Sequence, residues 1–212
     1  MKTLYSAFYT GDGYPFNHIA EEVVLAKNIT DLQEKDSALV IWGGADISPD
    51  LYKHPHSRTT YPSQTRDPIE WALLHQAIKL GIPIIGVCRG AQMLCAAAGG
   101  FLIQDVSNHH GSHMVHTYDG TIFNVNSIHH QMMAGYEKVS HKVLAWCDKP
   151  RSKSYLYRDD EFYQPPEDFK EPEMIWFPKI KGMAIQWHPE GMAVDSPAST
   201  FIFGELNAYG IQ

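Results

Sequence analysis

A chain of 212 residues, 44% of them hydrophobic, can bury one substantial core, so one domain over residues 1–212 is expected. Its formal net charge of −7 argues against nucleic-acid and anionic-membrane partners, which are themselves negative. It has no apolar run long enough to cross a bilayer and no secretion-signal pattern near residue 1. Three widely spaced cysteines without a CxxC pair favour the reducing cytoplasm over a disulfide framework.

Apolar runs alternate with helical patterns along the chain, which is typical of βαβ units around a largely parallel sheet. The first expected strand is Thr3–Thr10. Residues 15–35 fit either one helix or a short helix, a strand within residues 21–26 and a second helical turn, because periodicity does not distinguish these over a short apolar run. Residues 37–44 then predict a buried strand that ends in a glycine turn.

The clearest helix covers Asp67–Gly81, with Pro68 near its start, apolar residues at helical spacing, and Gly81 at its end. A buried strand follows and leads directly into a second helix. The later expected elements are four strands and a C-terminal helix, at residues 121–127, 141–147, 173–177, 182–188 and 196–209.

Residues 149–172 differ in composition from the rest of the chain. This segment is rich in charged residues, tyrosine and proline. We interpret it as an inserted loop or flap rather than as a boundary between domains.

Cys88 stands where an apolar strand stops and helix-forming residues begin. Gly86 and Gly90 flank it in a GxCxG pattern, typical of a nucleophile elbow in which small residues let strand and helix backbones pass closely. The helix N-terminus would favour the thiolate, which is the attacking form of cysteine. The alternative is a buried structural cysteine in an ordinary strand–helix junction, and the short motif alone does not decide between the two.

A nucleophilic cysteine needs a base, and the base needs a group that orients it. His188 and Glu190 lie two residues apart at the end of another expected strand, so their side chains point to the same side. The carboxylate can then fix the imidazole tautomer while the other ring nitrogen faces the thiol. Alone, the His-Pro-Glu sequence fits a surface turn, but with Cys88 it predicts a Cys–His–Glu triad.

The third requirement is an oxyanion hole. One donor is expected to be the backbone N–H of Arg89, the residue after the nucleophile. The other is expected from the glycine turn at Gly43 and Gly44, where no side chain would block the approach of a substrate. A plain β-turn is the alternative interpretation of these glycines.

Four motifs in order from Gly43 to Glu190 resemble a known family: WGGADISPDLY, GVCRGAQML, NSIHHQ and IQWHPEG. They resemble the class I glutamine amidotransferase superfamily, and within it the peptidase C26 group of γ-glutamyl hydrolases that act on γ-glutamyl-γ-aminobutyrate. The resemblance implies an α/β fold, a flavodoxin-like three-layer sandwich with a mostly parallel central sheet.

The same resemblance implies roles for individual residues. Cys88 would be the nucleophile, His188 the general base and acid, and Glu190 its orienting carboxylate. The N–H groups of Gly44 and Arg89 would line the oxyanion hole. Three further residues match positions at the substrate pocket, namely Gln92, Ser127 and His129.

The implied reaction is hydrolysis of a γ-glutamyl amide through a thioester on Cys88, with no cofactor. In the alternative, glutamine is the substrate and ammonia passes to a synthetase, which would be a separate protein partner because this sequence contains no synthetase domain. A more remote alternative is an inactive scaffold on the same fold. The presence of Cys88, His188 and Glu190 argues against a scaffold, which has no need of all three.

Twelve histidines suggest a metal site, above all residues 108–116, where His113 and His116 could lie close together. A zinc site needs about four ligands. No cysteine adjoins these histidines in the sequence and no HExxH spacing occurs, so the sequence predicts no metal. Cys95, on the same helical face as Cys88, and Cys147, in an apolar strand, are expected to be core residues.

Overall fold

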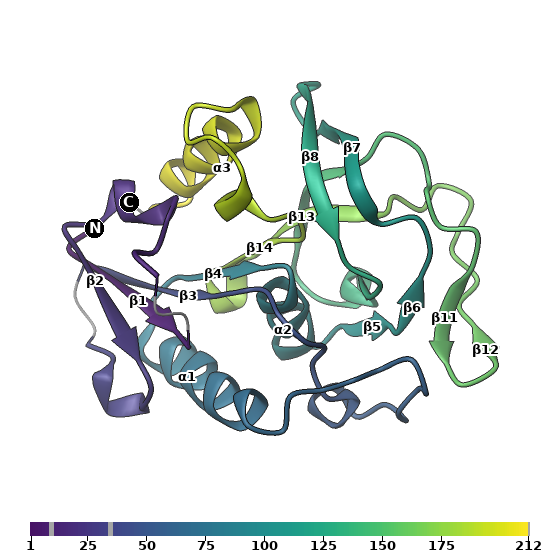
Figure 1. The fold of residues 1–212 in the computed structure, drawn as a ribbon, viewed down its shortest axis with the longest axis horizontal. Coiled ribbons are helices and arrows are strands. Elements are labelled where there is room, and N and C mark those ends of the chain that lie inside the picture. The colour runs from purple at the N-terminus through teal and green to yellow at the C-terminus, as the bar shows by residue number, and fades with distance from the viewer. Residues whose placement is uncertain (9–10, 34–35, 212) are drawn as a thin grey trace.

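The computed structural model describes residues 1–8, 11–33 and 36–211, and places nine strands of this part of the chain in one sheet (Figure 1). In order across the sheet they are β2 (Glu22–Ala26), β1 (Thr3–Ala7), β3 (Ser37–Ile41), β4 (Ile84–Val87), β14 (Gly182–Ile185), β13 (Pro172–Phe177), β10 (Lys142–Cys147), β7 (His110–Thr117) and β8 (Ile122–Ile128). Neighbours from β2 to β14 pair in parallel. The strands from β13 to β8 extend the sheet in antiparallel fashion.

Helices cover both faces of this sheet (Figure 1). Helices α1 (Arg66–Leu80) and α2 (Arg89–Ala98) lie on one face, and α3 (Pro197–Ala208) lies on the other. The chain therefore has the α/β three-layer fold that was predicted, with its parallel strands grouped in one half. None of the helices in the described residues is long and apolar enough to cross a membrane.

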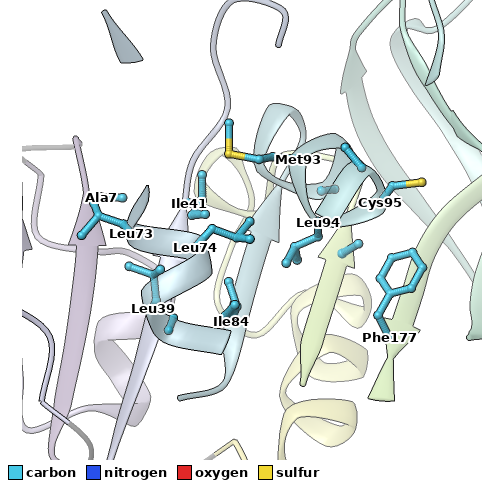
Figure 2. Close-up of a cluster of buried hydrophobic side chains, with 14 of the residues drawn as sticks. Ala7, Leu39, Ile41, Leu73, Leu74, Ile84, Met93, Leu94, Cys95 and Phe177 are labelled. Atoms are coloured by element: carbon cyan, nitrogen blue, oxygen red, sulfur yellow. The ribbon is translucent and has the colours of Figure 1, made fainter. Parts of the chain in front are cut away.

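Two separate apolar cores hold the layers together. Side chains of α1 and α2, such as Leu73 and Leu94, pack against Leu39, Ile41 and Ile84 of the parallel strands (Figure 2). The second core joins the opposite face of the sheet to α3, with members Val40, Val87, Ile185, Ile202 and Leu206. Strands buried on both faces explain why β3, after Ser37, and β4 read as continuous apolar runs without alternation.

The ambiguous segment near the N-terminus adopts the second of its two alternatives. Short 3-10 helices at Phe16–Ile19 and Ile29–Asp31 flank β2, which pairs in parallel with β1. Strand β1 ends at Ala7, and the last two residues of the expected Thr3–Thr10 strand lie outside the described residues. Four further 3-10 helices occur later in the described chain, at Pro49–Tyr52, Tyr136–Lys138, Pro178–Ile180 and Pro189–Gly191.

The 149–172 segment carries a small hairpin. Its strands β11 (Tyr155–Arg158) and β12 (Glu161–Phe162) pair with each other, and β11 also pairs with β6 (Asp105–Val106). The ring of Tyr157 lies 4.9 Å from that of His54, so the hairpin also contacts the loop that follows β3. A separate two-stranded pair joins β5 (Phe101–Ile103) to β9 (Met132–Ala134).

The backbones of β3, β4 and α2 pass very close to one another. A Cβ placed on Gly90 would overlap the carbonyl oxygen of Ile41 in β3, and one on Gly86 would overlap the carbonyl of Gly90. Both obstacles are backbone atoms, which cannot rotate away as a side chain could. These two glycines therefore set how closely helix α2 approaches the sheet.

Replacing Gly90 by alanine should destabilise the fold by about 3 kcal/mol or more, because the added methyl group forces α2 away from β3. Urea unfolding followed by circular dichroism would measure this loss. Gly204→Ala is the matched control, since Gly204 is exposed in α3 and a Cβ there meets nothing. The control should be neutral or stabilising by up to about 1 kcal/mol. An equal loss of stability in both variants would contradict the inference that Gly90 sets how closely α2 approaches β3.

Candidate active site

Cys88 lies at the sharp turn between β4 and α2, at the carboxyl end of the parallel strands. Its backbone has φ 50° and ψ −103°, a conformation that L-residues rarely adopt. Hydrogen bonds hold the turn on both sides: the Cys88 N–H donates to Ile185 (2.7 Å) and its carbonyl accepts from Gln92 (3.1 Å). Strain of this kind is characteristic of functional sites, where the surrounding structure imposes it.

His188 and Glu190 follow β14, the strand beside β4. The Nδ1 atom of His188 lies 2.7 Å from Oε1 of Glu190. A Cβ built on Gly43 would lie 2.8 Å from Cε1 of His188 and 3.5 Å from Cβ of Cys88. The imidazole of His188 and the side chain of Cys88 therefore both lie next to Gly43. The structure thus brings together the three residues that the sequence predicted as a triad.

The environment of His188 favours its protonated form. Burial by itself lowers the pKa of the imidazole, but interactions with the Cys88 thiol and the Glu190 carboxylate outweigh it and raise the pKa to about 10. Cys88 is only 5% exposed, so few water molecules reach it to weaken these interactions. A protonated imidazole beside a cysteine is the arrangement that supports a thiolate.

Asn126 of β8 fixes the backbone of His188 from both sides. Its side-chain amide donates to the His188 carbonyl (2.8 Å), and its oxygen accepts from the His188 N–H (3.0 Å). Asn126 thereby connects the antiparallel half of the sheet to the histidine. Sequence reasoning missed this residue, although Asn126 stands first in the NSIHHQ motif from which Ser127 and His129 were selected.

The glycine turn after β3 is held by Arg66, the first residue of α1. The Nη1 group of Arg66 donates to the Gly43 carbonyl (3.1 Å). In a trans peptide the C=O and N–H point in opposite directions, so this bond aims the N–H of Gly44 away from Arg66. Gly44 has φ 150°, and a Cβ there would overlap the Arg66 guanidinium, so only glycine fits.

The second predicted donor belongs to Arg89, whose N–H lies in the first turn of α2, where N–H groups have no acceptor within the helix. Its buried side chain forms ion pairs with Asp67 and Glu70 of α1. Glu70 also pairs with Arg66 (2.7 Å). One buried ionic network therefore links the start of α2 to the residue that orients the glycine turn.

The three residues matched to the substrate pocket gather around a single loop. Gln92 donates to the Gln131 carbonyl (3.2 Å), and Nδ1 of His129 lies 2.9 Å from that same oxygen. Burial lowers the pKa of His129 to about 3, so its ring is neutral at physiological pH. The hydroxyl of Ser127 donates to the His109 carbonyl (2.8 Å), which places it in the support of the loop. Substrate contact remains a prediction for all three residues.

The fold matches those of solved glutamine amidotransferases. The structure of PurLQS from Thermotoga maritima aligns with a TM-score of 0.64 and 14% identity over 98% of both chains. A glutamine amidotransferase from the same organism aligns with a TM-score of 0.55 and 14% identity, over 99% of this chain and 82% of that one. The architecture is therefore that of the class I glutamine amidotransferase-like proteins.

The sequence itself identifies the family. The family model of peptidase C26 matches residues 23–149, more than half of the chain, and the chain belongs to that family. A candidate glutamine amidotransferase of Mycobacterium tuberculosis is 42% identical over 97 residues, covering 40% of this chain and 32% of that protein. Protein NtpR of Enterococcus hirae is 28% identical over 209 residues, covering 87% and 78%. The match thus spans about a third of the Mycobacterium relative's length.

Replacing Glu190 by glutamine should lower the pKa of His188 clearly below its wild-type value of about 10, because an amide cannot balance the imidazolium charge. Histidine ring NMR signals followed between pH 5 and 11 would measure the shift. In the wild type, a folded pKa above the unfolded value of about 6.5 means that the stabilisation is complete below about pH 6.5 and is lost as the pH rises towards 10.

Glu205→Gln is the control for this titration, because Glu205 lies on α3 and pairs with Tyr118 instead. That variant should leave the His188 signal unchanged. An unaltered His188 titration in Glu190→Gln would show that the carboxylate does not set the charge of the ring.

Proposed function

We propose that this protein hydrolyses γ-glutamyl amides through a γ-glutamyl thioester on Cys88. The observation that carries the proposal is the convergence of a strained cysteine, at φ 50°, with an imidazole that pairs with a carboxylate 2.7 Å away. A buried structural cysteine has no need of the strained turn or of a charged histidine beside it. Membership of the peptidase C26 family supports the same reaction class.

The reaction has two steps, and each step passes through a tetrahedral intermediate. The Cys88 thiolate attacks the γ-carbonyl carbon, and the carbonyl oxygen takes up negative charge opposite the Gly44 and Arg89 N–H groups. As the C–N bond breaks, His188 gives its proton to the leaving amine. Water then attacks the thioester and gives a proton back to His188. The C–S bond breaks, and glutamate leaves the regenerated cysteine.

The second candidate function is glutaminase activity that supplies ammonia to a synthetase. One solved structure of the same fold, with a TM-score of 0.55 and 16% identity, is a candidate GMP synthase subunit from Thermoplasma acidophilum. By that name it belongs to an assembly of more than one polypeptide. The two functions share the triad and differ only in the leaving group and in the need for a partner protein.

Incubating the protein alone with glutamine and, in parallel, with γ-glutamyl derivatives of larger amines separates these functions. Release of the larger amines by the isolated chain is the expected result, measured as free amine and glutamate. Ammonia release from glutamine alone, absent with the larger amines, would instead favour the glutaminase. No turnover of either substrate, with Cys88 inert towards a glutamine-like electrophile, would contradict both and leave a scaffold.

Cys88→Ala should abolish turnover, by at least about 10³-fold in kcat, because no other group can form the thioester. Cys95→Ser is the matched control, since Cys95 lies further along α2, is buried in the apolar core, and donates to the backbone carbonyls of Phe101 and Ala134. The control should keep its activity, and both variants should keep the wild-type circular dichroism spectrum. Activity retained in folded Cys88→Ala would refute the assignment.

Arg66→Met tests whether Arg66 is a positioning residue for the oxyanion hole. Without its bond to the Gly43 carbonyl, the Gly44 N–H is no longer held in one direction, and kcat should fall by about tenfold to 10²-fold with KM little changed. Arg58→Met serves as the control, because Arg58 is an exposed arginine that pairs with Asp160. A rise in KM with constant kcat would instead point to ground-state binding by Arg66.

A further inference from the structure

Four buried side chains with metal-binding atoms converge in the antiparallel half of the sheet. They are His109, His113, Cys147 and Glu173, and one potential ligand atom from each lies within 4.8 Å of the others. His109 immediately precedes β7 and His113 lies within it, Cys147 ends β10, and Glu173 belongs to β13. Since β13, β10 and β7 are neighbours, the cluster spans three adjacent strands.

The distances between these ligand atoms suit a small ion with tetrahedral coordination. Oε1 of Glu173 lies 2.9 Å from Nε2 of His113, 3.2 Å from Sγ of Cys147 and 3.9 Å from Nδ1 of His109. Around zinc, bonds of about 2.0–2.3 Å place neighbouring ligand atoms roughly 3.3–3.8 Å apart. Small side-chain rotations would bring these four atoms to that spacing, because the observed distances lie on both sides of it.

Several polar atoms in the cluster lack hydrogen-bond partners among residues 1–8, 11–33 and 36–211. They include both ring nitrogens of His109, Nδ1 of His113 and Oε2 of Glu173, and among them Nδ1 of His109 is the atom that faces Oε1 of Glu173. His109 is fully buried and Glu173 is 1% exposed, so solvent does not satisfy these atoms either. Buried polar groups without partners are rare because they are costly, and a bound ion is one of the explanations for them.

Glu171 supplies the support that metal-binding histidines require. Its Oε2 lies 3.2 Å from Nε2 of His109, which is within ion-pair distance but not aligned as a hydrogen bond, so a small ring rotation would let Glu171 accept the Nε2 proton and leave Nδ1 free to bind an ion on the Glu173 side. The backbone N–H groups of Arg151 and Ser152 each donate to Glu171 over 2.8 Å, and the Tyr155 hydroxyl does so as well. All three donors belong to the inserted segment 149–172.

We propose that His109, His113, Cys147 and Glu173 bind a zinc ion. A thiolate and two imidazoles select a borderline-soft cation over Mg²⁺ or Ca²⁺, which prefer oxygen ligands. On binding, the Cys147 thiol releases its proton, so one thiolate, one carboxylate and two neutral imidazoles balance the two charges of Zn²⁺. Four protein ligands leave no open position, which makes this a structural site and not a catalytic one.

The ion would connect the inserted segment 149–172 to the loop after β8. That loop contains His129 and Gln131, which lie beside Gln92. The His109 carbonyl accepts from the His129 N–H (3.1 Å) and from the Ser127 hydroxyl (2.8 Å), so the same residue that binds the ion supports the loop after β8. On its other side, His109 contacts Glu171 and, through it, the insertion. The insertion therefore has a structural function here: it completes the surroundings of a metal ligand.

The sequence predicted no metal because no cysteine adjoins the histidines, and the structure supplies Cys147 from a strand next to β7. His116, which was considered together with His113, instead pairs with Asp148 at the surface (2.6 Å). The pairing of β10 with β7 in space, and not any spacing along the chain, assembles this donor set.

Cobalt tests the site because its spectrum reports ligand type and geometry. The full chain, stripped of metal with a chelator, should bind one Co²⁺ and show intense tetrahedral visible bands with a thiolate-to-cobalt charge-transfer band in the near ultraviolet. Zn²⁺ should displace the cobalt and raise the Tm. A folded chain that binds no cobalt would overturn the proposal and leave a buried histidine–glutamate network only.

The three cysteines provide matched variants. Cys147→Ser should lose the charge-transfer band, whereas Cys88→Ser and Cys95→Ser should keep it. If Cys147→Ser does not fold, His113→Asn serves in its place and should weaken Co²⁺ binding by at least tenfold while retaining the charge-transfer band. A band that disappears in Cys88→Ser would assign the cobalt to the catalytic thiol, and binding undiminished in both Cys147→Ser and His113→Asn would equally refute the site.

Discussion

The contact of Gly90 with the Ile41 carbonyl determines how the candidate site is built. Because nothing larger than hydrogen fits between α2 and β3, the chain must turn from β4 into α2 within one residue, and Cys88 takes the positive φ that this turn demands. The strain falls on Cys88, whose side chain is only 5% exposed and belongs to the core that joins the sheet to α3.

A network of buried charges fixes the position of this turn relative to the glycine turn at Gly43 and Gly44. The Arg89 guanidinium holds α2 against Asp67 and Glu70, while Glu70 holds Arg66, and Arg66 holds the Gly43 carbonyl. Burying such pairs contributes little net stability, because the loss of hydration offsets the Coulomb attraction. What the network does provide is a fixed geometry between two backbone N–H groups on different elements, which an apolar contact would not specify.

Much of this arrangement is visible in the sequence, and what is not visible has a physical reason. Local signals were sufficient for β1, β3, β4 and β14, for α1 and for the elbow glycines, because apolar runs and glycine positions reflect short-range constraints. They left β2 open between a helix and a strand. His188 could be linked to Cys88 because both follow strands whose carboxyl ends meet at one edge of a parallel sheet. Asn126 and Arg66 act through backbone groups of remote residues, and no pattern along the chain records such a partner. The buried His/Cys/Glu cluster was not expected for the same reason, since only the antiparallel pairing of β13, β10 and β7 collects its members.

The parallel and antiparallel halves of the sheet position different parts of the candidate site. The parallel half positions Cys88 and the glycine turn. The antiparallel half supplies Asn126, which fixes the backbone of His188, and the loop that Gln92 and His129 contact. The histidine thus depends on both halves, since β14 carries it and β8 holds it in place. The 149–172 segment contacts the antiparallel half through Glu171 and His109, and it also contacts the loop after β3 through Tyr157 and His54. Changes in that segment would consequently reach the loop after β8, whose His129 N–H and Ser127 hydroxyl both donate to the His109 carbonyl.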